Sequence, residues 1–246
     1  MTGLKSATVW ENKICFLQGG TVKNVPPCFF CRKGERTLED CYKTVEKPAQ
    51  DEFTQRRSRF IGYCHPVQTQ QQAQQFIQQI KSLHWDATHN VYAYILRSGE
   101  QRYSDDGEPQ GTAGVPCLEV LRKSGLVDAA VVVTRYFGGV LLGAGGLVRA
   151  YSHGAKLAIE ASGIVDMRLC ALCTVRCSYD QYGRIASLIP QCGGAVEDTS
   201  FTDDVCIKFH VAQDGLPFFE KQLSEVTSGQ IRTETIGKAY LPVKNR

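Results

Sequence analysis

The stretch TRYFGGVLLGAGGLVRAYSHGAKLAIEASG, residues Thr134–Gly163, places five glycines within nine positions, between an apolar strand-like run and an apolar helix. It is not a Walker phosphate loop, because no Lys-Ser or Lys-Thr pair follows the glycines. It does not match a dinucleotide fingerprint either, since counting from Gly143 puts Val148 where the last glycine belongs. The spacing predicts a tight turn whose glycines supply positive φ angles and close backbone approach, with weak anion binding at the helix start as the alternative.

The segments before this stretch alternate between strand and helix patterns. Apolar, β-rich runs predict strands over residues 58–67, 89–98 and 128–138. The run that begins at Thr69, a suitable N-cap residue, repeats apolar side chains at i, i+3, i+4 and i+7, which predicts an amphipathic helix over residues 69–85. A further helix is predicted over residues 117–125, where Gly125 ends it.

The order of the predicted elements changes after Gly163. A strand (169–179) and a helix (180–193) are followed by two strands (195–203 and 204–212), a helix (216–229) and a last strand (230–243). This is the β-α-β-β-α-β order of a ferredoxin-like unit. We therefore expect an α+β protein with a domain boundary near Gly163–Asp166, which gives domains over residues 41–163 and 164–246.

The charge is unevenly distributed along the 246 residues. The net charge of +3 comes from residues 1–50, which hold 8 Lys and Arg against 5 Asp and Glu, whereas residues 51–246 are neutral. A protein held on nucleic acid mainly by phosphate contacts would be more basic. The chain lacks the long apolar run of a membrane helix and the pattern of a secretory signal, so we expect a cytoplasmic protein with no membrane partner.

The cysteines give only a weak indication of a metal site. One close pair, Cys28 and Cys31, lies near Cys15 and Cys41, and a zinc site usually needs two such pairs, so these four residues are a weak alternative only. Within the predicted strand over 169–179, Cys173 and Cys177 share one face while Cys170 points the other way, which favours core packing. No metal and no cofactor is expected.

An acidic loop, YSDDGEPQGTAG (residues 103–114), allows two interpretations. Its Asp105, Asp106 and Glu108, together with His89, are the residue types that a hydrolase or a hard-cation site would use. Asp-Asp-Gly is also ordinary turn chemistry, and His89 can simply cap a hydrogen bond. No serine-nucleophile motif and no H-x-x-x-H spacing occurs, so no catalytic residue is assigned and the enzyme remains the alternative.

Cations and aromatic residues flank the glycine stretch. Arg135, Tyr136 and Arg149 lie on either side of it, and Arg56 and Arg57 form a second basic group in QRRSRF. If they are exposed, these side chains can contact RNA phosphates and stack on bases. If they are buried, the aromatic residue belongs to the core and the arginines are solvated caps.

Four segments together carry a family resemblance: SRFIGY, HWDATHNVYAY, YSDDGEPQGTAGVP and VVVTRYFGGVLLGAGGLVRAYS. From about Tyr42 to its end the chain resembles the bacterial two-domain form of the YigZ/IMPACT family. The resemblance implies an N-terminal domain like domain 2 of ribosomal protein S5, followed by a ferredoxin-like domain. Both folds resemble consecutive domains of the translocating elongation factor that contact the ribosome, and eukaryotic relatives act in translational control.

The resemblance favours a partner-facing surface over a phosphate cradle. It implies a non-catalytic regulatory protein that binds RNA, the ribosome or another part of the translation machinery, with a regulatory protein as a further partner. The residues expected at this surface are Arg56, Arg57, Arg135, Tyr136, Gly138, Gly139 and Arg149.

The first 40 residues match nothing in that family and show no sustained periodicity. Arg32–Glu35 can be encoded by a purine-rich ribosome-binding sequence, and Leu38 by an alternative start codon. We therefore expect residues 1–40 to be unstructured, with residues 1–37 either a translated leader or a real extension.

Overall fold

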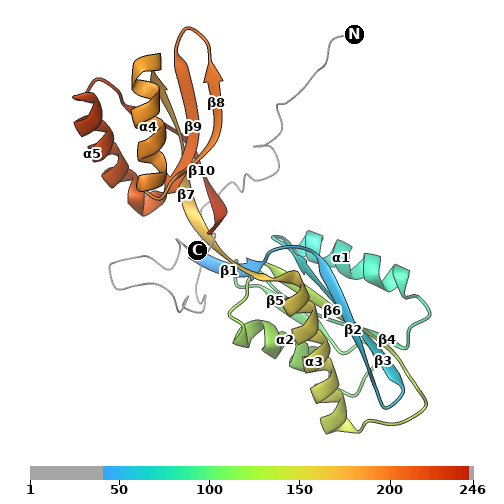
Figure 1. Ribbon diagram of the computed structural model, residues 1–246. Helices are drawn as coiled ribbons and strands as arrows, with labels where there is room; N and C mark the ends of the chain where they lie inside the picture. The colour runs from blue at the N-terminus through green and yellow to red at the C-terminus, as the bar shows by residue number, and fades with distance from the viewer. Residues whose placement is uncertain (1–40, 244–246) are drawn as a thin grey trace, which may run out of the picture. The chain divides into compact units, whose positions relative to one another are not determined.

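The computed structural model describes residues 41–243, which form two compact units that divide between Asp166 and Met167 (Figure 1). Each unit has one antiparallel sheet with helices packed on it, so the protein has the α+β class that the sequence predicts. Residues 1–40 and 244–246 lie outside the described part, and with them the predictions for the leader and for Cys15, Cys28 and Cys31. No helix between residues 41 and 243 is long and apolar enough to cross a membrane.

The N-terminal unit is built on a five-stranded sheet with the order β2-β3-β6-β4-β5. Every neighbouring pair in it is antiparallel. Its strands are β2 (Ala49–Gln55), β3 (Ser58–Pro66), β4 (His89–Ile95), β5 (Gln101–Ser104) and β6 (Ala129–Tyr136). A further strand, β1 (Cys41–Val45), runs beside the residues that precede β6, where the Val127 N–H donates to the Lys43 carbonyl at 2.9 Å.

The predicted strands over residues 58–67, 89–98 and 128–138 are confirmed as β3, β4 and β6, whereas β1, β2 and β5 were not predicted. The two missed strands of this sheet, β2 and β5, are its edges, and their side chains are mostly exposed and polar. A strand with little buried surface leaves no apolar run in the sequence, so periodicity cannot reveal it.

Helices cover both faces of this sheet (Figure 1). Helix α1 (Gln70–Leu83) begins as predicted, with the Thr69 hydroxyl accepting from the Gln72 N–H at 3.2 Å, and it buries its apolar stripe against Ile61, Tyr63 and Val132. Helices α2 (Gly114–Lys123) and α3 (Ala144–Ser162) pack on the opposite face. Helix α2 starts three residues before the predicted position.

The register of the three central strands aligns one row of side chains under α3. Phe60 on β3 lies opposite Arg135 on β6, and Arg135 lies opposite His89 on β4. The Phe60 ring meets the Tyr151 ring of α3 edge-on, with 5.4 Å between ring centroids. This row therefore brings a cation and an imidazole into the interior beside a buried tyrosine hydroxyl.

The C-terminal unit has the predicted element order. Its elements are β7 (Ile164–Cys177), α4 (Tyr179–Gln191), β8 (Ala195–Phe201), β9 (Val205–Ala212), the short 3-10 turn η1 (Gln213–Gly215), α5 (Leu216–Thr227) and β10 (Thr233–Val243). The five-stranded sheet that contains these strands has the order β1-β7-β9-β8, and β10 also pairs with β7. A core cluster joins alternate residues of β7 and β9 to both helices. Cys173 and Cys177 belong to that cluster while Cys170 lies in a separate cluster with Leu172, as the alternation along the strand predicts.

Candidate functional site

The turn between β2 and β3 carries two exposed arginines in an unfavourable backbone conformation. Gln55 pairs with Ser58, which leaves Arg56 and Arg57 as the two central residues of the hairpin. Their φ angles are 44° and 66°, the positive values that a type I′ turn requires and that normally select Asn-Gly. Within residues 41–243, no carboxylate lies within salt-bridge distance of either guanidinium.

The glycine loop packs directly against this turn. A Cβ atom on Gly138 would overlap the carbonyl group of Arg57, so only glycine allows the two backbones to approach this closely. The Gly138 N–H donates to the Ser58 hydroxyl at 3.3 Å, and the Arg56 guanidinium donates to the Leu141 carbonyl at 3.4 Å. The glycine stretch therefore holds the loop against the turn, as the turn interpretation predicts.

Apolar side chains stand exposed beside these cations. Leu141 is 80% exposed and Phe137 is 44% exposed, although both belong to an otherwise well-packed unit. Exposed apolar residues next to unpaired cations are typical of a surface that meets a partner. We call this area the turn surface and define it by six residues: Arg56, Arg57, Phe137, Gly138, Gly139 and Leu141.

Arg135 does not belong to the turn surface, which corrects the expectation that it contacts RNA. Its side chain is 6% exposed and donates to a Glu108 carboxylate oxygen at 2.5 Å. The guanidinium lies over the rings of Phe60 and Phe137, at 5.5 and 5.3 Å from their centroids. The reason is its place on β6, the middle strand of the sheet, where Glu108, Phe60 and Phe137 surround the guanidinium.

Tyr136 faces the other side of β6 and is half-buried. Its hydroxyl donates to Asp86 at 3.0 Å and lies 2.8 Å from Nδ1 of His84, whose Nε2 lies 2.6 Å from the Tyr63 hydroxyl. Burial lowers the pKa of His84, and the neutral imidazole fits this chain because it can donate at Nδ1 and accept at Nε2. Base stacking by Tyr136 stays a prediction, as does phosphate contact by Arg149, which is exposed on α3.

Two carboxylates of the acidic loop bind the chain's own donors. Asp105 accepts from the backbone N–H groups of Gly111, Ala113 and Gly114 at 2.8–3.1 Å, so it caps the start of α2. Asp106 accepts from the Lys81 ammonium at 2.6 Å and from the Asn90 N–H at 2.7 Å. Both side chains thus fix the loop that carries them.

Glu108 turns inward from the same loop. One of its carboxylate oxygens accepts from Arg135 and, at 2.8 Å, from the Tyr151 hydroxyl, whose pKa is raised by burial and by the nearby Glu108 charge. His89 donates from Nδ1 to the Asp106 carbonyl at 2.8 Å, because a carbonyl can only accept, and its Nε2 lies 3.7 Å from Glu108. The structure therefore brings His89, Asp106 and Glu108 together, while Asp105 points to α2.

Metal-ligand geometry is not found between residues 41 and 243, where no three His, Cys, Asp or Glu residues are placed to hold an ion. Cys41 lies in β1, and the other three cysteines of the weak zinc alternative are outside the described residues. Burial raises the pKa of the Cys64 thiol to about 12, which keeps this core cysteine protonated at neutral pH.

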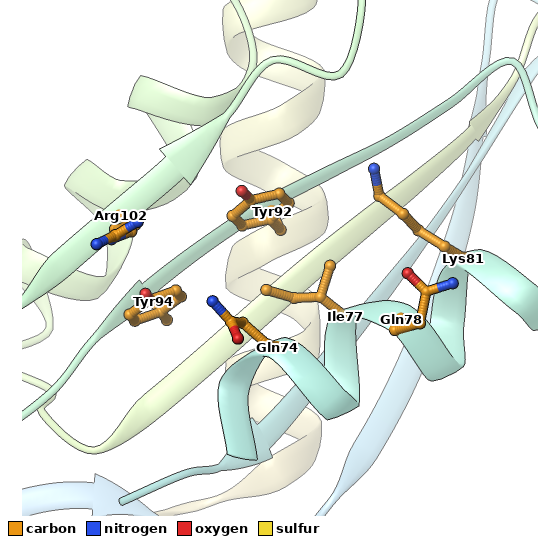
Figure 2. A pocket seen from close by; sticks show the side chains of 7 residues that line it. All are labelled: Gln74, Ile77, Gln78, Lys81, Tyr92, Tyr94 and Arg102. Carbon is orange, nitrogen blue, oxygen red and sulfur yellow. The ribbon is translucent and has the colours of Figure 1, made fainter. Parts of the chain in front are cut away.

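A pocket of about 250 Å³ between α1 and the β4–β5 edge is a feature that sequence reasoning missed (Figure 2). It is lined by Gln74, Ile77, Gln78, Lys81, Tyr92, Tyr94 and Arg102. Tyr92 and Tyr94 occupy alternate positions of β4, and Arg102 lies opposite Tyr94 on β5. No sequence pattern indicates this pocket, because the glutamines of α1 look like an ordinary solvated face and β5 was not predicted.

These features define a two-domain α+β protein whose N-terminal unit carries an exposed basic and apolar surface. Comparison with protein families finds the Impact N-terminal domain over residues 56–159 and a domain of unknown function, DUF1949, over residues 175–230. The first match lies within the N-terminal unit and the second within the C-terminal unit.

The chain covers most of the length of two bacterial relatives. The chain is 39% identical to IMPACT family member YvyE of Bacillus subtilis over 191 residues, which is 77% of this chain and 88% of that protein. It is 31% identical to IMPACT family member YigZ of Escherichia coli over 181 residues, 72% of this chain and 89% of that protein. A crystal structure of a hypothetical protein superposes with a TM-score of 0.52 at 29% identity, covering 80% of this chain and 98% of that one. The chain belongs to the IMPACT family, in its bacterial two-domain form.

Proposed function

We propose that this protein is a non-catalytic, cytoplasmic regulator of translation that binds RNA or the ribosome through the turn surface. In the same proposal the N-terminal unit has the fold of domain 2 of ribosomal protein S5. The C-terminal unit is ferredoxin-like, in keeping with the pairing of β10 with β7, of β7 with β9 and of β9 with β8. Family membership supports a role in translation, since the resemblance implies translational control for the eukaryotic relatives.

The observation that carries the proposal is the conformation of Arg56 and Arg57. A non-glycine residue at positive φ costs about 1–2 kcal/mol, and Asn-Gly would fill these turn positions with less strain. Strained backbone conformations cluster at functional sites. Nothing in residues 41–243 offers the two guanidinium groups a carboxylate partner, so their charges are available to an external anion.

The chemistry of the turn surface suits a nucleic acid. Each guanidinium presents a planar set of donors that matches phosphate oxygens, and the exposed Phe137 ring is a surface on which a base can stack. Residues 51–246 carry no net charge, so we expect modest affinity that depends on shape and on protein contacts as well as on phosphate. A regulatory protein with an acidic surface would meet the same cations.

A hydrolase that uses His89, Asp105, Asp106 and Glu108 is the competing proposal. The approach of His89 Nε2 to Glu108 supports it, but each of the three carboxylates already accepts hydrogen bonds from the chain's own donors. Such internal hydrogen bonds support a structural role for the loop, in which its residues hold α2 and Arg135 in place.

The test replaces the strained turn with its favoured sequence, in the double variant Arg56→Asn/Arg57→Gly. We expect the free energy of unfolding to rise by about 1 kcal/mol, because the strain is relieved. At the same time, ribosome co-sedimentation should weaken, and the slope of log affinity against log salt should flatten by about 1.5 units, for two lost phosphate contacts. Lys156→Ala is the control, since Lys156 is an exposed cation far along α3 that pairs with Glu160.

Binding that keeps its affinity and its salt slope in the double variant would overturn the proposal. Loss of turnover on a candidate substrate in His89→Ala, with ribosome binding intact, would favour the hydrolase instead.

A further inference from the structure

The pocket beside α1 exists because the helix is too narrow to cover the whole sheet. Helix α1 packs over β3, β6 and part of β4, where its buried residues meet the core. The edge strand β5 lies beyond that contact, and Gln74, Gln78 and Lys81 form the helix side of the depression (Figure 2). The opposite side is formed by Tyr92 and Arg102. This site is on a different face of the sheet from Phe60, Arg135 and α3.

The floor of the pocket is apolar and its wall is rich in uncharged hydrogen-bonding groups. Ile77 and Tyr94 are buried, while Tyr92 is half-buried. No side-chain hydrogen bond joins the Gln74 amide, the Gln78 amide or the Tyr92 hydroxyl to another residue between 41 and 243. An amide offers both a donor and an acceptor, the combination that reads the edge of a nucleobase. The Tyr92 ring offers an aromatic surface for stacking, beside the Lys81 ammonium, which lies 5.9 Å from the ring centroid.

The two cations of the pocket lie at opposite ends in Figure 2, and each already has a carboxylate partner. Lys81 donates to Asp106 at 2.6 Å, and Arg102 lies 3.2 Å from Glu100. The four groups together carry no net charge, although both cations keep further donors. The pocket therefore favours a planar, polar and uncharged group, with a nearby phosphate as a secondary contact. This differs from the turn surface, where neither arginine has a carboxylate partner within residues 41–243.

We infer that this pocket takes the base of one unpaired nucleotide, stacked on Tyr92 and hydrogen-bonded by Gln74 and Gln78. The volume of about 250 Å³ lies below the range of about 300–1,000 Å³ that accommodates drug-sized ligands, so it suits a single ring system rather than a dinucleotide. The base can come from single-stranded RNA or from a free nucleotide. The RNA source rests on the proposed function, while the pocket chemistry does not.

The experiment follows the side-chain amide signals of Gln74 and Gln78 by NMR in the full chain. The added ligands are AMP, UMP, a short single-stranded oligouridylate and an RNA duplex. We expect the mononucleotides and the single strand to shift these amides in a saturable way, and the duplex to leave them unchanged, because its bases are stacked and paired. The duplex can still bind at the turn surface.

Two variants test the contacts. Tyr92→Ala should weaken binding of the single strand about 5- to 150-fold with little change in its salt slope, as expected for a lost stacking contact. Gln78→Glu is the variant that preserves the fold, since Gln78 is exposed on α1, and its new charge beside the ligand should weaken binding about tenfold. Gln79→Glu adds the same charge about 100° further round the helix and should bind normally.

The outcomes separate this inference from the proposed function. A single strand that binds and shifts only turn-surface residues would overturn the inference and leave the proposed function standing. Mononucleotides that shift the glutamine amides would support the inference even if ribosome binding failed. Equal affinity in Gln78→Glu and Gln79→Glu, with both variants folded, would also overturn it.

Discussion

The acidic loop over residues 103–114 and the glycine loop over residues 137–143 are both conspicuous in sequence, yet they use their polar groups in opposite ways. In the acidic loop, Asp105, Asp106 and Glu108 each accept hydrogen bonds from the protein itself. Beside the glycine loop, Arg56 and Arg57 have no carboxylate partner in the described chain and occupy strained positions. The hydrogen-bonded carboxylates hold the acidic loop in place, whereas the proposed function assigns the charges of Arg56 and Arg57 to an external partner.

The two loops meet at one residue. Arg135 is the second-last residue of β6, close to the start of the glycine loop, and pairs with Glu108 of the acidic loop. Its Nη2 also lies 3.4 Å from the Ser58 hydroxyl, which accepts from the Gly138 N–H. Thus the acidic loop, through Glu108 and Arg135, supports the start of the glycine loop. Variants in each loop should therefore separate the roles of the two.

The largest effect is expected from removing the buried partner of Arg135. Glu108→Ala leaves a guanidinium charge buried without its carboxylate and should lower the free energy of unfolding by about 3–5 kcal/mol. Denaturant unfolding measures the change. Glu52→Ala, which breaks the exposed pair with Arg59, is the control and should cost about 1 kcal/mol or less.

Equal stability of these two variants would contradict a structural role for the acidic loop. Loss of an enzymatic activity in a stable Glu108→Ala protein would point to the hydrolase instead.

A smaller effect should follow from pH at Asp128, a buried carboxylate with a poorer cation partner. Its contact with the Arg97 guanidinium is 3.8 Å, against 2.5 Å for Glu108 and Arg135. Burial raises the pKa of Asp128 to about 6, above the value of about 3.9 for an unfolded aspartate. The folded state therefore binds more protons between these values, so stability is greatest below pH 4 and falls as the pH rises through 6.

The expected loss is about 2–3 kcal/mol between pH 4 and pH 7. Asp128→Asn keeps an oxygen for the Arg97 N–H, which donates to Asp128 at 2.7 Å, and should remove this part of the pH dependence. Unfolding free energies of both proteins across this range give the difference. Identical profiles would show that Asp128 is ionised in the folded protein without cost.

The smallest effect is expected within the glycine stretch, where Gly138 and Gly145 should respond to alanine in opposite directions. Gly138→Ala introduces a Cβ that overlaps the Arg57 carbonyl, so we expect a loss of about 1–3 kcal/mol and a displaced turn surface. Gly145 lies in the first turn of α3 with open space around it, so Gly145→Ala should stabilise the protein by about 0.4–1 kcal/mol. Thermal unfolding distinguishes the two, and opposite signs are the expected result.

Elements that bury a repeating apolar face could be predicted from the sequence. Helix α1 begins at the predicted cap and buries the predicted stripe, and the C-terminal unit has the predicted order of elements. The strands β2 and β5 could not be predicted, because edge strands expose polar side chains on most positions. The pocket was missed for the same reason, since one of its walls is β5.

The family, the α+β class and the glycine turn can be inferred from the sequence alone, because each depends on local periodicity or on ordered motifs. Which arginines have a carboxylate partner follows only from the three-dimensional fold. Arg135 and Arg56 look alike in sequence, but one lies in the central strand between helices and the other at the tip of a hairpin. Whether a charge meets a carboxylate or solvent depends on contacts between residues far apart in the chain, and local sequence carries no record of them.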